Sequence, residues 1–268
     1  MQEECWAAGG GKNITLLFDT QYLFIRSFKK LLRNPILLFF SLFQPIIFLV
    51  LFTQLFGRFA QVPGFPAESY LLFATPGIVL QNSFASAFQS GIAMVDDLKS
   101  GYLEKMLVTQ VSRPAIFLGR IATDIVRTII QSLIILVLAF MMGASPVTGV
   151  PGLLLMLLTI SLFGVAWSGI SISLGLKTKN AETVFGIGGF LTFPLLFMST
   201  ALTPANFMPD WMQTVSQLNP ISYTVDALRV VMLTGFDLGT IFTAFAVVGS
   251  IGVLTLGAAV YQFRKIIG

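Results

Sequence analysis

The chain has 268 residues, of which 55% are hydrophobic and 10% are charged. Soluble domains carry roughly 25% charged residues, so this composition excludes an ordinary soluble protein and indicates one polytopic membrane domain over residues 1–268. The chain has no histidine and one cysteine, Cys5, which excludes a histidine-containing metal site, a nucleophile paired with histidine and an intrachain disulfide.

Residues 1–35 are expected to form a cytoplasmic tail and an interface helix. The first residues are acidic and short of apolar side chains, unlike a cleavable signal peptide. The stretch AAGGGKN, residues 7–13, resembles a phosphate loop, but Trp6 stands at the first glycine position and Asn13 at the hydroxyl position. We therefore exclude ATP binding by this chain and interpret the stretch as a flexible tail.

A basic helical face precedes the first hydrophobic run. Its four members follow i, i+3, i+4, i+7 spacing: Arg26, Lys29, Lys30 and Arg33. Phenylalanines and leucines occupy another face, so the sequence predicts an amphipathic helix lying in the inner membrane interface. A juxtamembrane anchor and a docking surface for a partner both stay open.

Six hydrophobic runs are long enough to cross roughly 30 Å of hydrocarbon as helices. They lie near residues 36–56, 70–94, 115–142, 151–175, 184–202 and 239–262, and the short remainder 263–268 follows the last run. Small residues at four-residue spacing in the fourth run, such as Gly169 with Ser173 and Ser171 with Gly175, predict close packing of helix backbones.

The basic residues are distributed unequally between the two sides of the predicted membrane domain. This distribution indicates that the net positive charge of the chain orients it in the membrane and does not serve to bind nucleic acid. Outside, the six-span arrangement places Arg58 and Arg229. Inside, it places Lys12, Arg26, Lys29, Lys30, Arg33, Lys99, Lys105, Arg113, Arg120, Arg127, Lys177, Lys179, Arg264 and Lys265. The asymmetry predicts a multi-pass membrane protein with both termini in the cytoplasm.

The longest charged segment between runs, residues 96–114, is predicted to lie in the cytoplasm. Leu103, Met106 and Leu107 have helical spacing, which predicts a short amphipathic helix. Gly101 just ahead permits a tight turn. By itself, such a segment is also compatible with a simple solvated loop.

Three charged residues at the start of the third run are predicted to form an ion ladder. Arg120, Asp124 and Arg127 have a spacing that allows Arg120–Asp124 and Asp124–Arg127 pairs, and charges at this depth are costly unless they are paired. We expect the ladder to stiffen the helix at a dimer or partner interface, in preference to a substrate-contacting role this close to the cytoplasm. We expect no Asp, Glu, Lys or Arg in the central parts of the runs.

Residues 203–238 form a long external segment with two helical patterns. The dipeptide Asn219-Pro220 separates them, and proline suits the first position of the second helix. In that helix Ser222, Asp226 and Arg229 share a polar face, with Asp226 and Arg229 at the spacing of an ion pair. Each pattern is too short to span, so we predict an external re-entrant helical hairpin.

Two of these segments resemble the ABC-2 type transporter permeases, the membrane subunits of drug-resistance, polysaccharide and lipid exporters. The inside segment matches at Gly101, Glu104, Leu107, Thr109, Ser112, Arg113 and Pro114, while Gln110 stands where many members have proline. The outside segment matches the family signature at Pro220, Ile221, Ser222, Tyr223 and Arg229. The resemblance extends over nearly the whole chain.

The resemblance implies an all-α polytopic membrane protein with six transmembrane helices, an N-terminal interface helix, a cytoplasmic coupling helix and the external hairpin. It implies contact with a separate ATPase subunit through Asp97, Gly101, Glu104, Lys105, Leu107 and Arg113. It also implies two permease copies with two ATPase subunits that hold the ATP and Mg²⁺, and no cofactor in this chain. We expect Asn219, Pro220, Tyr223, Asp226 and Arg229 to hold the external hairpin and gate in shape.

The expected function is therefore export of an amphipathic, lipid-like or lipid-linked cargo, such as a drug, a glycolipid or a glycan, by a complex embedded in membrane lipids. An ATP-independent secondary transporter or channel is the alternative, and it would need an ionisable relay near mid-membrane. A membrane-embedded enzyme is disfavoured, because no set of acids, histidines or cysteines converges in the sequence.

Overall fold

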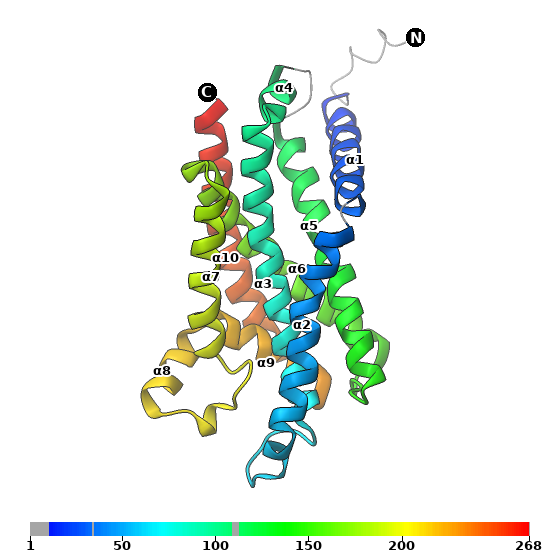
Figure 1. Cartoon of the computed structure of the whole chain (residues 1–268), viewed down its shortest axis with the longest axis vertical. Helices are drawn as coiled ribbons and strands as arrows, with labels where there is room; N and C mark the ends of the chain where they lie inside the picture. Colours follow the sequence, from blue (N-terminus) through cyan, green and yellow to red (C-terminus); the bar gives the residue numbers. More distant parts are fainter. Residues whose placement is uncertain (1–10, 34, 109–112, 268) are drawn as a thin grey trace.

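The computed structural model describes residues 11–33, 35–108 and 113–267, and every regular element within them is helical (Figure 1). The long helices are α1 (Gly11–Leu32), α2 (Pro35–Phe56), α3 (Tyr70–Lys99), α5 (Arg113–Met141), α6 (Gly149–Thr178), α7 (Ala181–Phe197) and α10 (Leu238–Ile267). The shorter helices are α4 (Tyr102–Val108), α8 (Asp210–Leu218) and α9 (Pro220–Leu233), with 3-10 turns η2 (Gly57–Gln61) and η3 (Ala205–Phe207).

Five of these helices are long and apolar enough to cross a membrane. They span Phe39–Gln61, Tyr70–Lys99, Ala115–Met141, Gly149–Thr178 and Leu238–Phe263. The fifth predicted run, residues 184–202, forms α7, which has 17 residues and is about 25 Å long at 1.5 Å per residue. Beyond Phe197 the chain continues in turns rather than as helix. The protein is thus a multi-pass membrane protein, and crossing by α7 stays a prediction.

Helix α3 forms the centre of the bundle. In its most apolar window 89% of the residues are buried, against 11% in α2 and 17% in α10. It packs closest on α6: a Cβ added to Gly175 of α6 would lie 2.7 Å from the Gly91 carbonyl oxygen of α3. Gly91 in turn faces the Ser171 backbone. The predicted small-residue packing of the fourth run is therefore present, with α3 as the partner of Ser171 and Gly175 and α10 as the partner of Gly169.

A second apolar core lies at the end of the molecule that carries α4. Its members are contributed by α1, α4 and the start of α5, among others, and include Leu23, Leu103, Met106, Ile116 and Phe117. The α1 helix predicted from the basic face is present and packs along α5 (Figure 1). Its placement in a membrane interface stays a prediction.

At the opposite end, the two predicted external helices are present and Asn219-Pro220 separates them. Four apolar side chains of α9 are buried, namely Ile221, Val225, Leu228 and Met232, and α9 packs on α3, α6 and α10. By contrast, α8 projects away from the bundle instead of lying along α9 (Figure 1). Trp211 and Leu218 of α8 are 58% and 80% exposed, and the re-entrant placement of the two helices stays a prediction.

Candidate functional site

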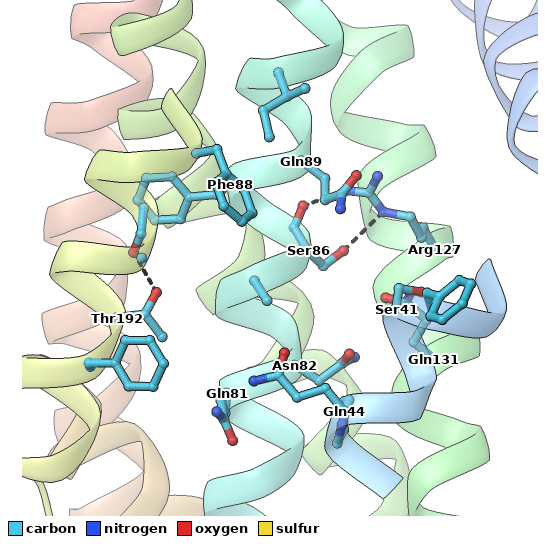
Figure 2. A pocket seen from close by; sticks show the side chains of 18 residues that line it. Ser41, Gln44, Gln81, Asn82, Ser86, Phe88, Gln89, Arg127, Gln131 and Thr192 are labelled. Atoms are coloured by element: carbon cyan, nitrogen blue, oxygen red, sulfur yellow. Dashed lines mark hydrogen bonds between the residues drawn. The ribbon is translucent and has the colours of Figure 1, made fainter. Parts of the chain in front are cut away.

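A cavity of about 450 Å³ opens between α2, α3, α5 and α7 (Figure 2). Its polar lining comes from Ser41 and Gln44 of α2, Gln81, Asn82, Ser86 and Gln89 of α3, Arg127 and Gln131 of α5, and Thr192 of α7. Gly188 of α7 leaves space beside Phe88, since an added Cβ would come within 2.6 Å of that ring. The cavity is therefore a mainly apolar recess with a limited set of polar groups, a common form of small-molecule site.

Arg127 lies deeper in the bundle than predicted. It stands 14 residues from either end of α5 and near the middle of the candidate span Ala115–Met141. The expectation that it lies at the end of the third run was therefore wrong, and so was the expectation that the central parts of the runs carry no charge. Its side chain is 11% exposed. It donates from Nε to the Ser86 hydroxyl at 2.9 Å and to the Ser86 carbonyl, and it pairs with Asp124 at 3.2 Å. A charge at this depth is stable because it is paired and hydrogen-bonded.

The predicted ion ladder is rearranged in the structure. Asp124 pairs with Arg127 as expected and also accepts a hydrogen bond from the Ser90 hydroxyl of α3. Arg120, instead of pairing within its own helix, donates to Asp97 of α3 at 3.1 Å and to the Ser90 carbonyl at 3.1 Å. The charges therefore tie α5 to α3 across the bundle.

Asp97 also connects α3 to α1. Its carboxylate accepts from Lys30 at 3.3 Å, besides Arg120. Nearby, the Arg26 guanidinium carbon lies 3.3 Å from the centroid of the Tyr102 ring at the start of α4. Burial raises the pKa of the Tyr102 phenol, which keeps the ring uncharged and suited to a cation–π contact. Helices α1, α3, α4 and α5 are thereby joined at this end.

The remaining residues predicted for ATPase contact belong to the α3–α4–α5 segment. Gly101 has a φ of 66°, which accommodates the turn that starts α4 and favours glycine. Lys105 is exposed, Glu104 and Leu107 lie in α4, and Arg113 begins α5. The side chains of Glu104, Leu107 and Arg113 lie outside the described part, as do residues 109–112 entirely.

The external residues predicted to hold the gate make specific contacts. Asn219 caps α9 by accepting from the Ile221 amide at 3.0 Å, and its own amide donates to the Leu195 carbonyl of α7 at 2.6 Å. Pro220 occupies the first turn of α9. The Tyr223 hydroxyl donates to the Gln217 carbonyl at 2.6 Å. These bonds join the end of α7 to α8 and α9.

The predicted pair of Asp226 and Arg229 is present at 2.9 Å. The sequence analysis missed its partners: Arg229 donates to the Thr200 carbonyl at 2.6 Å, and its guanidinium carbon lies 3.8 Å from the centroid of the Phe73 ring. Thr200 in turn donates to Asp226 at 2.8 Å. This set joins α9 to α3 and to the turn after α7.

The sequence analysis also missed the carboxamides of the cavity. Gln81, Asn82 and Gln89 stand in the second hydrophobic run and Gln131 in the third. Polar side chains inside a membrane span are expensive and usually functional. That signal was available from the sequence, although it does not reveal that the side chains face one recess.

The profile of the ABC-2 type transporter family matches residues 19–233, which include the whole cavity and both ends described above. The chain belongs to the ABC-2 type transporter family. It is 31% identical to the "Putative transport permease ycf38" of Cyanophora paradoxa, over 81% of this chain and 76% of the relative. It is 30% identical to the "Daunorubicin resistance ABC transporter permease protein DrrB1" of Streptomyces coeruleorubidus, over 79% and 75%.

A further relative is the "Probable doxorubicin resistance ABC transporter permease protein DrrC" of Mycobacterium tuberculosis, at 25% identity over 86% of this chain and 81% of the relative. The chain is accordingly a membrane component of an ABC transporter. Permeases of this family work with an ABC ATPase that carries out the hydrolysis. Membership of this family therefore favours an ATP-driven transporter over the alternative of an ATP-independent transporter or channel.

Proposed function

We propose that this chain is the permease of an ATP-driven exporter that moves an amphipathic cargo outward across a prokaryotic plasma membrane. The cargo is a drug-like, lipid-like or lipid-linked molecule. Two permease copies and two ATPase subunits make up the complex. The cavity between α2, α3, α5 and α7 forms part of the wall of the transport pathway. The drug-resistance names of two relatives support a drug-like cargo.

One structural relationship carries this proposal. Helix α4 stands between α3 and α5, the same two helices that contribute Gln81, Asn82, Ser86, Arg127 and Gln131 to the cavity. A partner that pushes on α4 would thus displace two cavity walls directly. Rigid-body movement of packed helices is an established way to transmit such a push.

The placement of the charged segments supports the proposed orientation. The end of α10, α1 and α4 lie at one end of the molecule, and α8 lies at the other (Figure 1). We assign the α4 end to the cytoplasm, where an ATPase can reach α4, with α7 as the sixth crossing. The cavity opens between α2 and α7 (Figure 2), where exposed Phe40 and Phe185 would face lipid or the second permease copy.

The test is to reverse the charge of Glu104. The full chain is purified with its ATPase subunit, and complex formation and ATP-dependent uptake of an uncharged fluorescent amphiphile into inverted vesicles are measured. We expect Glu104→Arg to lower both by at least about tenfold, since it removes a charge-assisted contact of about 1.5–3 kcal/mol and adds repulsion.

The matched control is Arg58→Glu, a charge reversal in η2 at the opposite end of the molecule. It should leave complex formation unchanged. Normal assembly and normal ATP-dependent uptake in Glu104→Arg would show that α4 is not the contact with the ATPase.

A further inference from the structure

We propose that the cavity between α2, α3, α5 and α7 binds cargo through an uncharged polar group, rich in hydroxyl or carbonyl groups, that is attached to an apolar body. This inference rests on the proposed function, because it names the class of cargo that the exporter's own cavity would take. It excludes cargo recognised through a phosphate or an ammonium group at this site.

The first observation is the concentration of carboxamides. Among the described residues of the five apolar spans, eight are Gln or Asn, and five of them line this one cavity. The five are Gln44, Gln81, Asn82, Gln89 and Gln131; the others are Gln54, Gln61 and Gln262. A carboxamide both donates and accepts hydrogen bonds, which matches hydroxyl and carbonyl groups without a charge.

The second observation is that three of these carboxamides hold buried polar atoms without a partner. They are the Gln81 Oε1, the Asn82 Nδ2 and the Gln131 Oε1. The three residues are 7%, 3% and 3% exposed. Buried polar atoms are almost always hydrogen-bonded, and leaving them unpaired is costly. Two acceptors and one donor at a single recess therefore indicate a ligand group that both donates and accepts.

The third observation concerns charge. The one ionised side chain among the described lining residues is Arg127, and it is committed to Asp124 and to both oxygens of Ser86. The acid and the base of that pair cancel each other. A phosphate or an ammonium group entering the cavity would lose its hydration without gaining a free counter-ion, which is unfavourable in a membrane interior.

The apolar body has its own surface in the cavity. Four aromatic rings contribute to the lining, those of Phe40, Phe88, Phe185 and Phe193. Phe185 and Phe193 of α7 are 71% and 51% exposed and are thus available to a ring or an alkyl chain that enters from the open side. Aromatic side chains stack on flat apolar groups and pack against chains.

The experiment compares three photoactivatable probes that share one dodecyl chain with a diazirine. Their head groups are a glucoside, a phosphate monoester and a trimethylammonium. The full chain and its ATPase subunit are reconstituted in phosphatidylcholine nanodiscs, irradiated with each probe, and digested for mass spectrometry. We expect adducts on cavity peptides of α2, α3, α5 and α7 with the glucoside, and at least about fivefold fewer with either charged probe.

Variants then assign the preference to the carboxamides. Asn82→Leu and Gln131→Leu should each weaken glucoside labelling by about fivefold, as expected for the loss of one hydrogen bond. The double variant should weaken it further. Gln54→Leu makes the same chemical change at an exposed position of α2 outside the cavity and should change nothing. The comparison of probes on the unaltered chain decides the question even where a variant fails to fold.

The inference is overturned if the phosphate or the ammonium probe labels the cavity as strongly as the glucoside does. It is also overturned if none of the three probes labels the cavity. Full glucoside labelling in the folded double variant overturns it as well. ATP-dependent transport is measured separately in the same preparation. ATP-dependent transport of a charged probe alone would support the proposed exporter function and overturn the preference for uncharged cargo. Labelling of the cavity by the glucoside without any ATP-dependent transport would support that preference and overturn the exporter function.

Discussion

The guanidinium of Arg120 donates to the carboxylate of Asp97 at 3.1 Å and so fastens α5 to α3 directly beside α4. Both side chains are mostly buried, with 13% and 14% of their surface exposed. The same carboxylate holds Lys30 of α1. Asp97 is therefore the point where α1, the central helix α3 and the cavity-wall helix α5 meet.

We expect Asp97→Asn to destabilise the folded chain by about 1–3 kcal/mol, because a mostly buried Arg120 would lose its charged acceptor. It should also lower cargo-stimulated ATP hydrolysis by the complex. Thermal unfolding in detergent measures the first effect. Lys30→Ala is the control: its side chain is 58% exposed, and such surface pairs contribute about 0–1 kcal/mol. Equal effects of the two variants would contradict the central role of Arg120–Asp97.

Arg229 should be the most sensitive residue at the end of the molecule that carries α8 and α9. Arg229→Leu removes the pair with Asp226, the bond to the Thr200 carbonyl and the stacking on Phe73. We expect a loss of about 2–4 kcal/mol in the free energy of unfolding. Tyr223→Phe removes one neutral hydrogen bond at an exposed position and should cost about 0.5–1 kcal/mol. Chemical denaturation compares them, and a reversed order would refute this account of the external end.

Close packing of α3 on α6 predicts that Gly91 does not tolerate a side chain. An alanine Cβ at this position would collide with the backbone of Ser171. Gly91→Ala should therefore destabilise the chain by about 1–3 kcal/mol. Gly249→Ala in α10 meets no atom within 4 Å and should be neutral or stabilising by up to about 1 kcal/mol. Thermal unfolding of the two variants provides the comparison.

Crossing by α7 can be tested with single cysteines in a Cys5→Ser background. Lys177→Cys lies just before α7 and Gln217→Cys lies beyond it, and both positions are exposed. A membrane-impermeant maleimide applied to intact cells should label the second and not the first, because a crossing helix separates them. Lys105→Cys should react only after permeabilisation. Labelling of both flanking positions from outside would mean that α7 does not cross.

The local elements were predictable because each is encoded by neighbouring residues. The apolar runs specify the long helices, Asn219-Pro220 specifies the break between α8 and α9, and Asp226 and Arg229 are close enough in sequence to pair on one helix. The helix with Leu103 and Met106 was likewise visible as a period of 3–4 residues. The predicted run 184–202 extends beyond the C-terminal end of α7, because apolar residues continue past Phe197 although the helix ends there.

The sequence by itself determined that this chain is a helical membrane protein with one charged and one re-entrant-like segment at its two ends, because hydrophobicity and helical period are local properties. Only the tertiary structure decided that Arg120 binds Asp97, that Arg127 lies at mid-depth on Ser86, and that carboxamides from three helices line one recess. These contacts join residues up to 90 positions apart, as in Gln131 with Ser41. The rotation and depth of each packed helix set them, and neither quantity can be obtained from one run alone.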